Sequence, residues 1–140
     1  QIACGTILPS KGKVFISIDD DNKKFIVTVV KKLIDLKFII VATKGTAKFL
    51  NDHNLKVETI NKVKEGGSHI VKAISDNQID LVINTTKTQG SIRDSYSIRR
   101  TALTFNIPYY TTIAGAKVAV DTIEHLKNNN LKVKSLQDLI

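Results

Sequence analysis

The chain has 140 residues and a formal net charge of +8, with 42% hydrophobic and 24% charged residues. This length favours one domain with a real core, and this composition excludes intrinsic disorder as the main interpretation. No apolar run approaches the roughly 20 residues of a spanning helix, and the single cysteine, Cys4, excludes an intrachain disulfide and a thiolate zinc site. We therefore expect a cytoplasmic protein without membrane contact.

The first half of the chain alternates short apolar runs with segments of helical periodicity. Val14–Ile18 predicts a strand, and the apolar spacing from Ile26 to Ile34 predicts a helix after it. The next predicted elements are a strand at Phe38–Ala42, a short helix at Thr46–His53 and a brief strand at Val57–Thr59.

The second half repeats this alternation. It predicts a helix at Ser68–Ser75, a strand at Ile79–Ile83 ending at Asn84, a helix with Ile98, Ala102 and Phe105 on one face, a strand at Tyr109–Thr112, and a last long helix carrying Ala116, Ala119, Val120 and Ile123. Asn128–Asn130 are expected to break that helix, and Ser135 with Asp138 predicts a capping box for a further terminal turn. Five apolar strands alternating with helices predict an α/β fold: a three-layer sandwich whose five-stranded parallel sheet is flanked by helices.

The segments that follow the predicted strands carry mostly Thr, Lys, Asn and Gly. Parallel sheets of this class bind ligands outside the carboxyl ends of their strands. These residue types supply hydrogen-bond donors and positive charge for an anion such as a phosphate monoester, whereas proton transfer requires a tuned carboxylate or histidine. The sequence therefore predicts a site that binds a ligand, with no catalytic residue.

Thr43-Lys44-Gly45-Thr46 is the strongest piece of this site, because Gly45 permits close approach of a ligand and a helix N-terminus follows. The alternative is that Thr43 or Thr46 only caps the helix. Lys23 and Lys62 are candidate anion ligands, or else ordinary surface lysines. Asn84-Thr85-Thr86 offers donors and acceptors for a base or sugar, against plain strand-end turn chemistry.

Other tempting residues have simpler interpretations. His53, His69 and His125 lie at unrelated spacings, so no metal site is predicted. Asp19–Asp21 lacks the pattern of a calcium loop and is expected to form a solvated turn at a helix start. A basic nucleic-acid-binding module remains an alternative, but the three arginines and the lack of an aromatic-interleaved basic stripe argue against it.

Six blocks in order carry a family resemblance: Gly12–Ser17, Ala42–Ala47, Asn61–Gly66, Ile83–Thr86, Asp94-Ser95 with Ile98–Arg100, and Tyr110–Thr112. On these blocks the chain from Gly12 to Ile140 resembles the carboxyl-terminal regulatory domain of the carbamoyl phosphate synthetase large subunit, in the methylglyoxal-synthase-like fold family. Residues 1–11 resemble the connector from a preceding domain. Because the chain also lacks methionine, we expect it to be a piece of a longer protein.

The resemblance implies a crevice that binds allosteric nucleotides of the UMP or IMP type. The family's phosphate-binding positions correspond to Lys23, Thr43, Thr46 and Lys62, and Ser17, Asn84, Thr85 and Thr86 line the same pocket. For the parent enzyme it implies ATP- and glutamine-dependent synthesis of carbamoyl phosphate for pyrimidine and arginine biosynthesis. The partners implied are the synthetase domains of the same chain and a glutaminase small subunit, and ATP with Mg²⁺ or Mn²⁺ is implied in those domains, with no cofactor in this one.

Two departures from related patterns bear on the ligand. Ornithine-activated relatives carry an acidic residue before the Thr pair, where this chain has Tyr110, so Thr111 is retained without its charge partner. N-acetylglutamate, the effector of mitochondrial relatives, stays open. A stand-alone methylglyoxal synthase acting on dihydroxyacetone phosphate is the enzymatic alternative, but Ser68 after Gly66-Gly67, together with Lys87, stands where that enzyme has its carboxylates.

Overall fold

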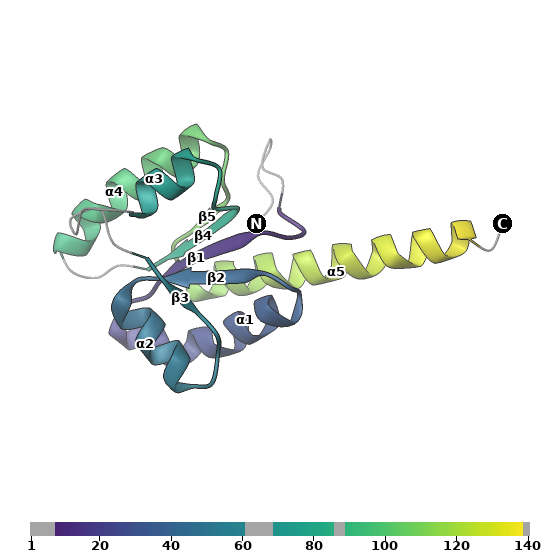
Figure 1. Ribbon diagram of the computed structural model, residues 1–140, viewed down its shortest axis with the longest axis horizontal. Helices are drawn as coiled ribbons and strands as arrows, with labels where there is room; N and C mark the ends of the chain where they lie inside the picture. The colour runs from purple at the N-terminus through teal and green to yellow at the C-terminus, as the bar shows by residue number, and fades with distance from the viewer. Residues whose placement is uncertain (1–7, 61–68, 86–88, 139–140) are drawn as a thin grey trace.

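The computed structural model describes residues 8–60, 69–85 and 89–138, and its strands form one parallel sheet in the order β3-β2-β1-β4-β5 (Figure 1). The strands are β1 (Lys13–Ser17), β2 (Ile39–Ala42), β3 (Glu58–Thr59), β4 (Leu81–Asn84) and β5 (Tyr109–Tyr110). The chain runs outward from β1 in one direction through β2 and β3, then in the other through β4 and β5. The switch point of the sheet, where ligands bind in such folds, therefore lies between β1 and β4.

The helices cover both faces of this sheet, as Figure 1 shows. They are α1 (Lys23–Asp35), α2 (Lys44–Asp52), α3 (Ile70–Ser75), α4 (Gln89–Thr104) and α5 (Ile113–Asp138), with a 3₁₀ turn at Asp20–Asn22 before α1. Helices α3 and α4 lie on one face, and α1, α2 and α5 lie on the other. The predicted three-layer α/β sandwich is confirmed.

Alternation along the strands divides the core into two apolar clusters. Val14 and Ile16 of β1 point to the face of α1 and α5, while Phe15 between them points to the face of α3 and α4. All three side chains have no solvent exposure. Burial on both faces explains why the strands appear in the sequence as continuous apolar runs.

Some details of the predicted elements are wrong. Helix α5 runs without interruption through Asn128–Asn130, and Ser135 and Asp138 lie within it instead of starting a new turn. Each asparagine lowers helix stability by only about 0.7 kcal/mol relative to alanine, and the Asn129 amide lies 3.0 Å from the His125 ring nitrogen one turn earlier. Phe105 lies just beyond α4 and is exposed, whereas Ile98 and Ala102 are buried as predicted.

Four helices end on a residue with positive φ. Asn54, Asn77 and Asn106 follow α2, α3 and α4, and Lys37 follows α1 with a φ of 75°. Asparagine tolerates this left-handed conformation better than most residues, and lysine does not share that preference. The αL termination sends each chain segment back toward the next strand.

Helix α5 is held against α1 by polar contacts as well as by the core. The Lys32 ammonium lies 2.7 Å from an Asp121 oxygen and 3.4 Å from Glu124, and the Asp121 hydrogen bond raises the pKa of Lys32. Lys127 of α5 donates to the Leu36 carbonyl at 2.7 Å, which satisfies an acceptor at the end of α1.

Within the described ranges, no helix combines the length and apolarity needed to span a bilayer.

Candidate functional site

A row of polar side chains lies at the carboxyl ends of the central strands, one position beyond the last apolar row. Ser17 ends β1 and pairs in register with Asn84, which ends β4. Thr43 directly follows Ala42, the partner of Ile16 in β2. The structure therefore places Ser17, Thr43 and Asn84 side by side across the switch point of the sheet, as the strand-end argument predicted.

Thr43 occupies the N-cap position of α2 without capping it through its side chain. Its hydroxyl instead lies 3.4 Å from the Ser17 hydroxyl and 3.4 Å from the Thr46 hydroxyl. The first N–H groups of a helix have no intrahelical acceptor, and the Thr43 side chain does not supply one here. The capping interpretation of Thr43 is wrong, and the start of α2 presents donors at the positive end of a helix dipole.

Thr46 and Thr85 connect the strand ends to the loop after β1. The Thr46 hydroxyl accepts a hydrogen bond from the Ile18 N–H at 3.1 Å, and the Thr85 hydroxyl accepts one from the Asp19 N–H at 3.0 Å. Thr46 is 2% exposed and Thr85 6%. These hydroxyls therefore stabilise the loop geometry as well as belonging to the candidate site.

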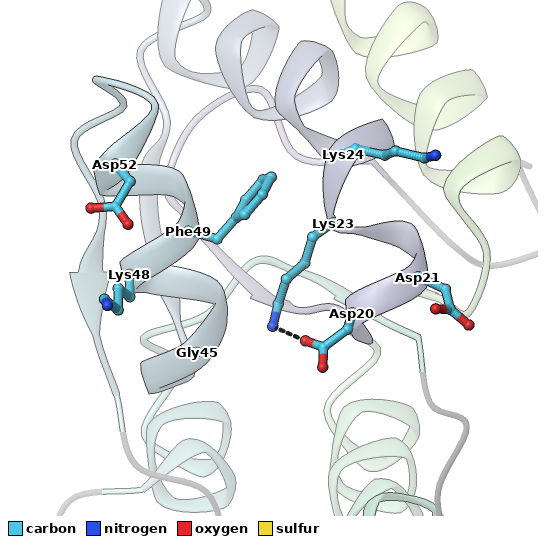
Figure 2. Close-up of a pocket in the computed structure, with 8 residues that line it drawn as sticks. All are labelled: Asp20, Asp21, Lys23, Lys24, Gly45, Lys48, Phe49 and Asp52. Carbon is cyan, nitrogen blue, oxygen red and sulfur yellow. Dashed lines mark hydrogen bonds and ion pairs between the residues drawn. The ribbon is translucent and has the colours of Figure 1, made fainter.

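Lys23 begins α1 and reaches toward the first turn of α2, as Figure 2 shows. Its Nζ lies 3.4 Å from where a Cβ on Gly45 would stand, and it pairs with Asp20 at 2.5 Å. The Asp20 side chain is 92% exposed, so its pairing with Lys23 contributes little net free energy. A bound anion is able to replace Asp20 as the partner of Lys23.

An open cleft of about 590 Å³ lies between the start of α1 and one face of α2. It is lined by Asp20, Asp21, Lys23, Lys24, Gly45, Lys48, Phe49 and Asp52. In Figure 2, Phe49 lies between the two helices, whereas Lys24 and Asp21 point away from that space. The positions on α2 follow helical spacing, a signal that the sequence contained and that the strand-end argument did not use.

Several residues singled out by the sequence either lie outside the described residues or belong to other parts of the fold. Lys62 and Thr86 lie outside the described residues, as do Gly66-Gly67-Ser68 and Lys87. Thr111 is exposed beyond β5, and Tyr110 before it is buried, which raises the pKa of its phenol. Asp19–Asp21 forms the expected turn before α1, with the Asp19 carboxylate accepting from the Asn22 N–H at 3.2 Å.

The histidines of the described chain belong to three separate local structures. His53 lies 2.8 Å from the Phe49 carbonyl, His69 accepts from the Lys72 N–H at the start of α3, and His125 contacts Asn129. Over residues 8–60, 69–85 and 89–138, no three His, Cys, Asp or Glu side chains gather as a set of metal ligands.

Tyr109 is a site neighbour that the sequence analysis missed. Its hydroxyl accepts a hydrogen bond from the Asn84 amide at 2.9 Å, and Asn84 is only 3% exposed. A tyrosine in a short strand is ordinary by composition, so nothing in the local pattern indicates this contact. The contact follows from strand register, which pairs Tyr109 with Val82 two residues before Asn84.

The site therefore combines the start of α2, which Thr43 does not cap, with the Lys23 ammonium and a row of hydroxyl and amide groups. This arrangement suits a ligand with an anionic end and a neutral polar end, because ammonium and N–H donors bind the first and hydroxyls with a carboxamide bind the second.

Comparison with known proteins gives one consistent family. The family model for the MGS-like domain matches residues 25–111. The chain is 44% identical over 140 residues to the carbamoyl phosphate synthase large chain of Myxococcus xanthus, covering all of this chain and 13% of that protein. It is also 44% identical over 140 residues to the carbamoyl phosphate synthase large chain, C-terminal section, of Methanopyrus kandleri, covering 99% of this chain and 26% of that protein.

A solved structure supports the fold. The methylglyoxal synthase of Elizabethkingia anophelis superposes with a TM-score of 0.61 at 21% identity, covering 81% of this chain and 79% of that one. At this identity the likeness concerns the fold, a parallel sheet flanked by helices. The chain spans only about an eighth to a quarter of the curated relatives named above. The family match covers more than half of the chain, and the chain belongs to the MGS-like domain family.

Proposed function

We propose that this chain is the allosteric effector-binding domain of a carbamoyl phosphate synthase large chain and that it binds a nucleoside monophosphate of the UMP or IMP type. The assignment to this parent enzyme is supported by 44% identity along the chain to such large chains. In that enzyme the domain regulates ATP- and glutamine-dependent synthesis of carbamoyl phosphate, together with the synthetase domains and a glutaminase subunit. The domain itself carries no step of the reaction.

One observation carries the choice of an anionic ligand. Thr43 stands at the start of α2 but does not cap it, and the Lys23 ammonium lies beside the same turn. Backbone N–H groups, a helix dipole and a lysine together favour a phosphate group there. The hydroxyls of Thr43 and Thr46, together with Lys62, complete the proposed phosphate site.

The second half of the proposed site recognises the nucleoside. Ser17, Asn84 and Thr85 lie at the strand ends beside the switch point. With Thr86, the next residue in the chain, they supply both donors and acceptors. A phosphate alone needs only the first half, whereas a nucleotide contacts both. This division of the site separates recognition of the phosphate from recognition of the sugar and base.

Regulation then follows from differential affinity. A ligand shifts the balance between two domain arrangements only by binding one of them better, and such couplings are commonly about 1–3 kcal/mol. In this proposal, the nucleotide favours one packing of the domain against the synthetase domains. The change in packing alters their affinity for ATP.

Calorimetric titration tests the proposal directly. UMP, IMP, N-acetylglutamate and inorganic phosphate are titrated separately into the wild-type chain, Lys23→Met and Lys31→Met. Lys31 is the matched control, since it is an exposed lysine of the same helix, two turns from Lys23. We expect saturable nucleotide binding that Lys23→Met weakens about tenfold, the loss typical of a charged hydrogen bond, and that Lys31→Met leaves unchanged.

The same samples also test the enzymatic alternative. Turnover of dihydroxyacetone phosphate by the wild-type chain would replace the proposal with a methylglyoxal synthase. Equal loss of binding in Lys23→Met and Lys31→Met would indicate nonspecific attraction to a basic protein. Tight binding of N-acetylglutamate with no response to UMP or IMP would contradict the nucleotide assignment.

A further inference from the structure

Tyr109 and Asn84 form a polar contact across β4 and β5 beside the candidate site. Register pairs Tyr109 with Val82, so Tyr109 and Asn84 are diagonal neighbours on the sheet face covered by α3 and α4. The Asn84 amide donates to the Tyr109 hydroxyl at 2.9 Å. Asn84 thus has a partner outside the row of strand-end residues.

The Tyr109 ring is itself held in place. It packs against the apolar cluster on the α3 and α4 face, which includes Val82 and Ile98. The Arg99 guanidinium of α4 lies 5.9 Å from the ring centroid, within the range of a cation–π contact. The tyrosine hydroxyl is therefore held in place, and its hydrogen bond with the Asn84 amide orients the carboxamide.

Orientation matters because a carboxamide has a donor arm and an acceptor arm. Rotation by half a turn exchanges the two, so an asparagine discriminates between ligand groups only where a neighbour sets its rotation. Asn84 is 3% exposed, and a buried polar group with a fixed partner is well suited to this task.

We infer that Tyr109 is a positioning residue that sets the Asn84 carboxamide for recognition of the nucleoside part of the ligand and has no part in binding its phosphate. This inference rests on the proposed function. In this proposal Tyr109 acts through Asn84.

Removal of one hydroxyl tests the role. Tyr109→Phe keeps the ring and its packing and deletes the acceptor for the Asn84 amide. We expect its affinity for UMP or IMP to fall about three- to tenfold, the ratio for one hydrogen bond, while its affinity for inorganic phosphate stays at the wild-type value. A general structural defect would weaken both ligands equally, and that result would overturn the inference.

Tyr96→Phe is the matched control. Tyr96 is 67% exposed on α4, so deletion of its hydroxyl is expected to change neither affinity. Nucleotide binding by Tyr109→Phe equal to wild type would overturn the inference. So would a loss of the same size in Tyr96→Phe.

A spectroscopic readout keeps this inference separate from the proposed function. The side-chain amide signals of Asn84 in a ¹H–¹⁵N spectrum, assigned from their absence in Asn84→Ala, are expected to shift in Tyr109→Phe and to stay in place in Tyr96→Phe. If the wild-type chain binds no nucleotide, the proposed function fails, and unchanged Asn84 signals in Tyr109→Phe would overturn the positioning role independently.

Discussion

Thr46→Val separates the structural role of the Thr46 hydroxyl from its proposed role in binding. Valine has nearly the same shape as threonine but leaves the Ile18 N–H, now 3.1 Å from the Thr46 hydroxyl, without that acceptor. Both residues are buried, and an unsatisfied buried donor costs about 1–3 kcal/mol. We expect urea denaturation to show a loss of that size in the free energy of unfolding with an unchanged m-value.

Thr46→Ser is the control, because serine keeps the hydroxyl and loses only a methyl group, worth about 1 kcal/mol. Repeating the denaturation with nucleotide present tests the proposed binding role. A ligand at one hundred times its Kd stabilises the wild-type fold by about 2.7 kcal/mol. In Thr46→Val we expect a smaller gain, and in Thr46→Ser a gain close to wild type. A Thr46→Val chain as stable as wild type, or less destabilised than Thr46→Ser, would refute the reasoning.

Three further predictions concern the fold around the site. In Gly12→Ala the new Cβ would lie 1.8 Å from an Asp80 oxygen at a φ of +125°, so we expect a loss of about 2–4 kcal/mol in urea denaturation, and a loss below 0.5 kcal/mol would contradict the clash. Lys37→Gly relieves a lysine with positive φ, and calorimetry should show a gain of about 1 kcal/mol; a lower Tm would refute this. Burial raises the pKa of Tyr110 above its unfolded value of about 10, so its contribution is present below about pH 10 and is lost as pH rises through the folded pKa. Tyr110→Phe should therefore lose less stability than wild type as pH rises above about 10, and equal losses would contradict the burial effect.

The order of elements could be predicted because β1, β2 and β4 are buried on both faces and each helix packs one face against the sheet. Val14, Phe15 and Ile16 are apolar without alternation, which marks a central parallel strand, and a helix follows each such run. The error in α5 has a simple cause. Three asparagines together disfavour a helix by only about 2 kcal/mol, and packing of Ala116, Ala119 and Ile123 against α1 and the sheet fixes the helix before they are reached.

The strand-end residues of the site could also be predicted, because carboxyl ends of parallel strands meet at one edge. Ser17, Thr43 and Asn84 are neighbours for that reason. The role of Lys23 is less direct than its position indicated. Its positive charge at a helix start is already paired with the Asp20 carboxylate. A spacing of three residues allows this contact, but the pattern of apolar residues gives no sign of it.

Tyr109 could not be predicted, because its contact depends on the register between two short strands, and a shift of one residue would turn its ring to the other face. Among the proposed phosphate ligands, Lys23 lies on α1 and Thr43 and Thr46 lie at the start of α2. Asn84, on the other side of the switch point, contacts Tyr109, whose ring lies beside Arg99 of α4. Under the proposed function, inorganic phosphate contacts only the first side, whereas a nucleotide contacts both sides. The affinity for a nucleotide would then depend on how α4 packs against the sheet. Because only differential affinity moves an equilibrium between arrangements, this proposal assigns regulation to the nucleoside half of the ligand.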